Sequence, residues 1–330
     1  MTSARVRLTL GLAAAGLSGM LVAVQSRVNG GLAVEIGSGY VAAAFSVGSG
    51  LVLLFVALAF SRSGRQGFSR LMGELRSGRF PRWALLGGLV GGLFVLAQSA
   101  IAPLTGLALF TIGVVVGQVC GGLILDIVGI GPGGRIAASV PRVAGTVLAV
   151  VGVIVSVLGG VSGDLILLVV APILLGVAVS AQSMSNGLIR SAAGSALTAT
   201  IVNFTVGFAL LLVLALVSIW VQGWPSVWPS TPWYYIGGPL GIVFVALSAI
   251  LVRPLGVLLL SMSSVAGQLV AAALIEAGLP LAGGLTPWMV AGCAITLAAV
   301  AIATVPGRSS DRSRGGSRGG SRGEAPLSPR

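Results

Sequence analysis

Ten long apolar runs, almost free of charge, constrain this chain more than any other feature. They are 17 to 25 residues long, and at about 1.5 Å per helical residue each is long enough to cross the hydrocarbon core of a bilayer. They cover residues 8–28, 40–60, 83–102, 106–126, 143–159, 165–185, 197–221, 234–252, 255–275 and 287–305. Runs this long and this uniformly apolar exclude barrel strands. We therefore predict an all-α polytopic membrane protein with ten transmembrane helices.

Composition agrees with this prediction. Charged residues make up 8% of the chain, against about 25% in an ordinary soluble domain. The two cysteines, Cys120 and Cys293, lie inside apolar runs and are interpreted as buried small residues, so neither a disulfide framework nor a metal site is expected. Residues 307–330 are rich in Gly, Ser and Arg, which predicts a disordered tail.

The arginines predict the orientation in the membrane. The chain has 19 Arg and no Lys, and with a cytoplasmic N-terminus 18 of the 19 fall on the cytoplasmic side, as the positive-inside rule requires. The exception is Arg27. The net charge of +12 is thus a topology signal, and no nucleic-acid partner is expected. We predict a multi-pass protein of a bacterial-type plasma membrane with both termini in the cytoplasm.

A polar pattern in the first apolar run returns in the sixth. The segment Gln25-Ser-Arg-Val-Asn29-Gly matches Gln182-Ser-Met-Ser-Asn186-Gly at a distance of 157 positions. A second pattern, Gln118 with Asp126, matches Gln268 with Glu276 at a distance of 150 positions. Rare polar residues that match in the same order indicate a duplicated unit. We predict two five-helix repeats, residues 1–160 and 161–306.

An odd number of helices per repeat makes the second repeat enter the membrane in the opposite sense. The arginines agree, because the segment with six Arg after the second run corresponds to a charge-free, Trp-rich segment at 223–233. Tryptophans suit the outer interface, where their rings lie at headgroup level. The prediction is a 5+5 inverted-topology repeat, an architecture common among secondary transporters.

These motifs resemble a known family. The inverted repeat of Gly-rich helices resembles the drug/metabolite transporter superfamily. Within it, Ala23-Val-Gln-Ser-Arg-Val-Asn-Gly30 and Gly117-Gln118 are similar to the YdcZ-type group of inner-membrane exporters, with Ser180 in place of Ala23 in the second copy. Members of that group are often single five-helix units that act in pairs. The resemblance covers about residues 5–306 and implies a fused form, a monomer or homodimer, that exports an unspecified small molecule.

The buried amides are the candidate pathway residues. Gln25 and Asn29 are four residues apart and share a helix face, as do Gln182 and Asn186. An amide in hydrocarbon is costly unless it is paired or faces a polar cavity, so these side chains either line a substrate pathway or join helices by hydrogen bonds. The full set of candidates is Gln25, Arg27, Asn29, Gln118, Gln182, Asn186, Asn203 and Gln268, with Ser46 as the counterpart of Asn203.

Three charged residues have two interpretations each. Arg27 lies about 28 Å along its helix, so it either extends to the outer interface or lines the pathway, paired with Glu35. Asp126 and Glu276 lie at helix ends, where each is either a proton-coupling carboxylate or a solvated helix terminus. The superfamily's small multidrug members use a Glu in their first helix, whereas this first helix has no acid before Glu35. The sequence therefore leaves open whether protons are the coupling ion.

The pattern as a whole predicts a secondary transporter. It would export a small metabolite or drug-like compound by alternating access at the repeat interface, with the bilayer and the substrate as its partners. The chain has no His, no metal-ligand cluster and no Walker motif, so neither an enzyme nor a bound cofactor is expected. The alternative is a non-transporting membrane scaffold or a lipid-interacting protein, which a dry, fully packed interior would favour.

Overall fold

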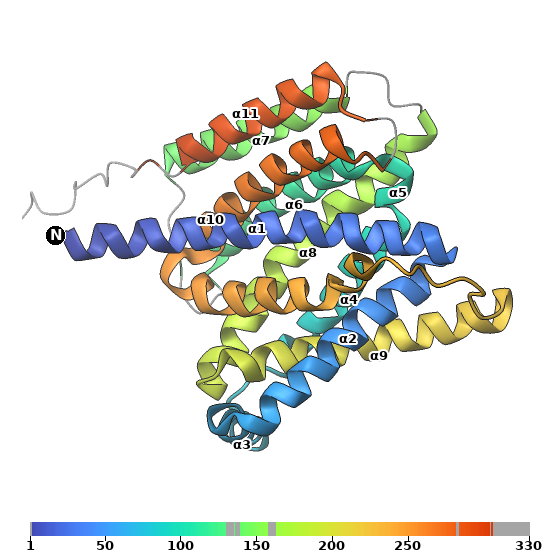
Figure 1. Ribbon diagram of the computed structural model, residues 1–330. Coiled ribbons are helices and arrows are strands. Elements are labelled where there is room, and N and C mark those ends of the chain that lie inside the picture. The colour runs from blue at the N-terminus through green and yellow to red at the C-terminus, as the bar shows by residue number, and fades with distance from the viewer. Residues whose placement is uncertain are drawn as a thin grey trace, which may run out of the picture.

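The computed structural model describes residues 2–129, 135, 139–157, 163–281, 284–303 and 305, and every regular element in that part of the chain is helical. This confirms the predicted all-α class. The elements are shown in Figure 1 and run α1 (Thr2–Ile36), α2 (Gly39–Phe60), α3 (Arg62–Arg76), η1 (Arg82–Leu86), α4 (Gly87–Ala100), α5 (Ala102–Thr105), α6 (Leu107–Val128), α7 (Val140–Val157), α8 (Gly163–Ala193), α9 (Ala196–Gln222), η2 (Pro232–Tyr235), α10 (Gly237–Gly278) and α11 (Pro287–Ala303). The predicted disordered tail lies outside the described residues.

Within the described residues, seven helical segments are long and apolar enough to cross a membrane. They are α1, α2, the combined η1 and α4, α6, α8, α9 and α10, while α7 and α11 are apolar but shorter. The longest, α10, has 42 residues and is interrupted at Gly256, where φ is 76° and ψ is 167°. Only glycine adopts this backbone conformation readily. The two runs predicted as separate helices at 234–252 and 255–275 therefore lie on two arms of α10.

Helix α1 lies between these two arms. Gly241 in the first arm faces Gln25 of α1, and Gly267 in the second arm packs against the backbone of Gly16. Along α1 the first arm runs antiparallel and the second parallel, so the arms run in opposite directions, as Figure 1 shows.

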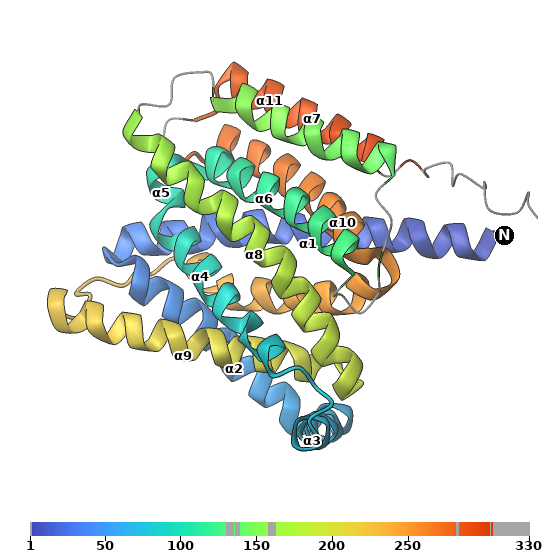
Figure 2. The same ribbon diagram turned by 180° about the vertical axis from the view of Figure 1, so that it is seen from behind.

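Helix α8 is held in the same way by α4 and α6. Gly91 of α4 faces Gln182 of α8, and Gly117 of α6 packs against Gly176. Figure 2 shows α8 crossing between these two helices. Here α4 and α6 are joined through the short α5 and through Gly106, whose φ of 77° and ψ of 152° closely match those of Gly256. Helices α7 and α11 pack chiefly on each other at one edge of the bundle (Figures 1 and 2).

The Arg-rich segment after α2, which lies between two predicted spans, contains the helix α3. Ser61 caps α3 by accepting a hydrogen bond from the Gly64 amide at 3.0 Å. Gly64, Gly67 and Leu71 form its buried stripe, and Thr198 of α9 donates to the Gly64 carbonyl at 3.1 Å. The spacing of three and four residues along this stripe is helical. This helix and the N-terminus of α1 lie toward one end of the bundle, and the connection from α9 to η2 lies at the other (Figure 1).

Candidate functional site

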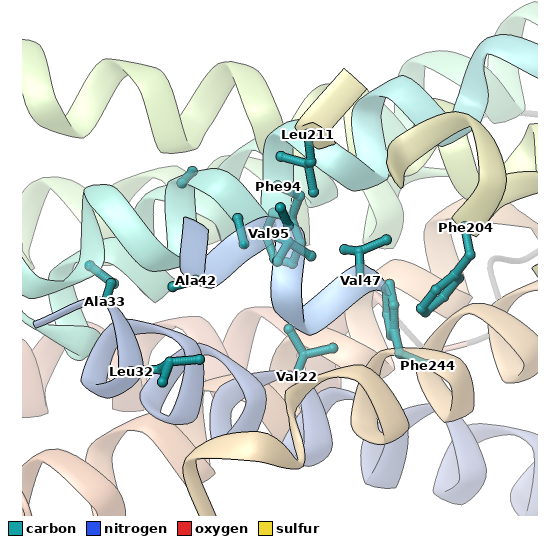
Figure 3. Packing of buried hydrophobic residues seen from close by; sticks show 14 of the residues in the cluster. Val22, Leu32, Ala33, Ala42, Val47, Phe94, Val95, Phe204, Leu211 and Phe244 are labelled. Carbon is teal, nitrogen blue, oxygen red and sulfur yellow. The ribbon is translucent and has the colours of Figure 1, made fainter. Parts of the chain in front are cut away.

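A small cavity lies in the middle of the bundle, where α2, α4, α9 and α10 meet beside Gln25 of α1 and Gln182 of α8. Its volume is about 30 Å³, enough for one or two water molecules. Its apolar wall includes Val47, Phe94, Val95, Phe204 and Phe244, and Figure 3 shows these side chains converging from four helices. Among the described residues that line it, none carries a charge.

Most of the lining consists of residues related by the two sequence offsets found above. Gln25 and Gln182 differ by 157 positions, as do Ser46 and Asn203. Three further pairs differ by 150 positions, namely Gly91 with Gly241, Phe94 with Phe244 and Val95 with Val245. A Cβ atom added to Gly91 would lie 2.7 Å from Nε2 of Gln182, and one added to Gly241 would lie 2.7 Å from Nε2 of Gln25. Both glutamines therefore approach the cavity over a glycine.

The two glutamines differ in their hydrogen bonding. Gln182 donates from Nε2 to Oδ1 of Asn203 at 3.3 Å, and Asn203 donates from Nδ2 to Oδ1 of Asn186 at 3.1 Å. Gln25 is only 4% exposed, yet no hydrogen bond joins its side chain to another described residue. The Oγ of Ser46 is also buried and has no hydrogen-bond partner among the described residues. The cavity thus has unused polar groups on one side.

Asn29 lies behind the cavity and not on its lining. Its Nδ2 donates to Oε1 of Gln98 in α4 at 2.8 Å, and both side chains are fully buried. Asn186 does not line the cavity either; it accepts a hydrogen bond from Asn203, which does. Sequence reasoning missed Gln98, although an amide inside an apolar run was the signal available. Of the predicted pathway residues, Gln25, Gln182 and Asn203 line the cavity.

The predicted pair Gln118 and Gln268 lies between α6 and the second arm of α10. Nε2 of Gln268 donates to Oε1 of Gln118 at 3.4 Å and to Oγ of Ser264 at 3.2 Å. Neither glutamine lines the cavity. In membranes such interhelical bonds are worth about 0.6–2 kcal/mol each, so this contact joins helices.

The two acids cap helices, and the interpretation as solvated helix ends is wrong. Asp126 is 3% exposed and Glu276 is 1% exposed. The Asp126 carboxylate accepts hydrogen bonds from the Val257 and Leu258 amides at 2.9 and 3.0 Å, and Arg142 lies 3.3 Å away. Carboxylates at a helix N-terminus are favoured by its unpaired N–H groups and its dipole.

Glu276 performs the reciprocal task, because its Oε2 accepts from the Leu107 amide at 3.1 Å, at the start of α6. Leu107 and Val257 are 150 positions apart, as are the two acids. Each carboxylate at the end of one helix therefore caps the start of the other.

Arg27 is half-buried and does not line the cavity. Its Nε donates to the Leu279 carbonyl at 3.0 Å, just after the end of α10, and its guanidinium lies 5.5 Å from the centre of the Trp233 ring. No ion pair joins it to Glu35 in the described structure, so the predicted pairing is wrong. The described residues also hold no cluster of His, Cys, Asp or Glu that fits a metal ion.

A bundle of long apolar helices around a small uncharged cavity defines a multi-pass membrane protein. The model of the family described as "Putative inner membrane exporter, YdcZ" matches residues 10–155 and 167–302, and the chain belongs to this family. The family is described as one of exporters, which is not a class of enzymes. The match confirms the resemblance predicted from the sequence. The chain is accordingly a transporter of the plasma membrane.

The fold has a counterpart among solved structures. One, titled "Crystal structure of protein", is 20% identical with a TM-score of 0.55, over 92% of this chain and 97% of that one. At this identity the likeness concerns the fold alone. No curated protein matches the chain.

Proposed function

We propose that the chain is a secondary transporter that exports a small metabolite or drug-like compound by alternating access at the interface of two repeats. The observation that carries this proposal is the central cavity, because equivalent residues of both halves line it, led by Gln25 and Gln182. In transporters built from inverted repeats the substrate site lies at the repeat interface.

The proposal includes ten spans arranged as five plus five, in repeats 1–160 and 161–306. Support comes from the broken α10, whose two arms around α1 correspond to α4 and α6 around α8. Counting these arms separately, with α7 and α11, gives ten apolar helices in the part of the chain that the structure describes. The two segments that match the family, 10–155 and 167–302, divide the chain at a similar point.

The cavity must open for transport. About 30 Å³ is far below the 300–1,000 Å³ or so of a site for a drug-sized ligand. The helices around it cross at glycines: Gly50 approaches the Gly238 carbonyl, and Gly207 approaches that of Gly88. Small residues at a crossing let the two helix backbones approach closely. We propose that these two crossings, equivalent in the repeats, open in turn on opposite sides of the membrane.

Orientation and coupling belong to the same proposal. Cytoplasmic termini are supported by the arginines and by the common end at which α3 and the start of α1 lie (Figure 1). Asp126 and Glu276 are the candidate coupling residues for protons, since they are the buried acids among the described side chains. Export that loses its sensitivity to an uncoupler in Asp126→Asn and Glu276→Gln would support coupling; normal, uncoupler-sensitive export in both would remove these acids from that role.

The test is a growth and efflux screen of a deletion strain against a panel of metabolites and toxins. We expect the wild-type chain to restore export of at least one compound and Gln182→Leu to abolish it. Gln222→Leu is a matched control, because Gln222 is exposed at the end of α9. If the wild-type chain changes no efflux, the scaffold alternative takes the place of transport.

A further inference from the structure

We infer that the transported compound is an uncharged molecule that combines hydrogen-bonding groups with an apolar body. This inference rests on the proposed function, because it assigns a substrate class to the central cavity. It is carried by three features of the lining, namely its lack of charge, its unused polar groups and its aromatic wall.

The charge of the lining is the first feature. Among the described residues around the cavity there is no acidic or basic side chain. Charges elsewhere in the bundle are already engaged, the half-buried Arg27 with the Leu279 carbonyl and the buried Asp126 with two backbone amides and Arg142. An ion that left water for this cavity would lose its hydration without gaining a countercharge, which is costly in a low-dielectric interior.

The unused polar groups are the second feature. The Ser46 hydroxyl, which can donate or accept, is buried without a partner in the described structure. No hydrogen bond joins the Gln25 amide, with its two donor hydrogens and its acceptor oxygen, to another described residue. Both side chains are 4% exposed and line the cavity. Buried polar groups left unpaired are costly, so a ligand with neutral hydroxyl or amide groups regains that energy when it binds. A purely apolar ligand would not.

The aromatic wall is the third feature. Phe94, Phe204 and Phe244 approach the cavity from three different helices, beside Val47 and Val95 (Figure 3). Such a wall favours an apolar or aromatic body. Aromatic faces also attract cations, so a cationic ligand is the competing outcome that the experiment must separate.

The experiment measures binding to the purified full chain in detergent by thermal stabilisation. The probes are aromatic scaffolds supplied in three charge states, with benzamide, benzylamine and benzoate as one set. We expect the uncharged member of at least one set to bind at least tenfold more tightly than its charged counterparts. Gln25→Glu should reverse the preference, binding the amine at least tenfold better than wild type does. Gln222→Glu, the same change at an exposed position, should leave the preference unchanged.

The outcomes separate this inference from the proposed function. If wild type binds the charged members more tightly, the inference of an uncharged substrate is wrong. The proposed transport function, which needs only a cavity that binds a ligand, is not contradicted by that result. If Gln25→Glu does not fold, Ser46→Asp tests the same reversal. Absence of binding by every set overturns the uncharged class as well. Transport itself is judged separately, by the efflux screen and by whether Ser46→Cys reacts with a thiol reagent.

Discussion

Nε2 of Gln268 donates a hydrogen bond to Oε1 of Gln118 at 3.4 Å, so two residues 150 positions apart touch each other. In the proposed repeat they are equivalent, and equivalent residues of a two-fold arrangement meet only near its axis. The reciprocal caps at Asp126 and Glu276 lie on either side of this contact along the same two helices. The axis of the proposed repeat therefore passes between α6 and the second arm of α10.

Close glycine packing at equivalent places predicts equal sensitivity to added bulk. A Cβ atom at Gly267 would overlap the Gly16 carbonyl, and one at Gly117 would overlap the Ile173 carbonyl. We expect Gly267→Ala and Gly117→Ala each to lower the free energy of unfolding by about 1–3 kcal/mol, seen as a lower Tm in detergent. Gly278→Ala is the control, since open space surrounds that position at the end of α10. Equal Tm values for all three variants would contradict this packing.

The Asp126 cap predicts a graded loss of stability. Its two oxygens accept from two backbone amides, whereas the Asn side chain has one acceptor oxygen and Ala has none. Hydrogen bonds to charged groups contribute about 1.5–3 kcal/mol. We expect the Tm of Asp126→Asn to fall below that of wild type and the Tm of Asp126→Ala to fall further. A solvated carboxylate would instead give three similar melting curves.

Arg27 is predicted to stabilise the fold without selecting the substrate. It bridges α1 to the Leu279 carbonyl and lies against Trp233, away from the cavity lining. We expect Arg27→Ala to lower the Tm by the equivalent of about 1–2 kcal/mol. The ratio of export rates between two substrates, once identified, should stay as in wild type. A changed ratio at unchanged Tm would return Arg27 to the pathway.

Topology is testable with two matched serine replacements. Ser69 in α3 and Ser226 in the connection after α9 are both exposed. In a background without Cys120 and Cys293, Ser69→Cys should react with a membrane-impermeant thiol reagent only from the cytoplasmic side. Ser226→Cys should react only from the outside. Labelling of both from one side contradicts the proposed orientation.

The all-helical class was predictable because the apolar runs are long and uninterrupted. Helix α3 was not, since its many arginines conceal the buried stripe of Gly64, Gly67 and Leu71. Charge density indicated an exposed segment, and exposure of one face is compatible with a helix that packs its other face.

The site was predictable where its residues are chemically rare. Gln25 and Gln182 were found because amides are unusual in apolar helices. The helical period places Asn29 on the same helix face as Gln25. It does not specify which helix that face packs against, so the Asn29–Gln98 hydrogen bond could not be predicted. Phe94 with Phe244 and Gly91 with Gly241 are common residue types in such helices, and only their shared position at the cavity distinguishes them.

The central claim, that the small central cavity becomes accessible from each side of the membrane in turn, is tested most directly at Ser46. This serine lines the cavity, whereas Ser99 is also buried but donates to the Val95 carbonyl and does not line the cavity. In a background without native cysteines, we predict that Ser46→Cys reacts with a membrane-impermeant thiol reagent from either side, while Ser99→Cys stays unreactive. A folded Ser46→Cys protein as unreactive as Ser99→Cys from both sides would contradict alternating access.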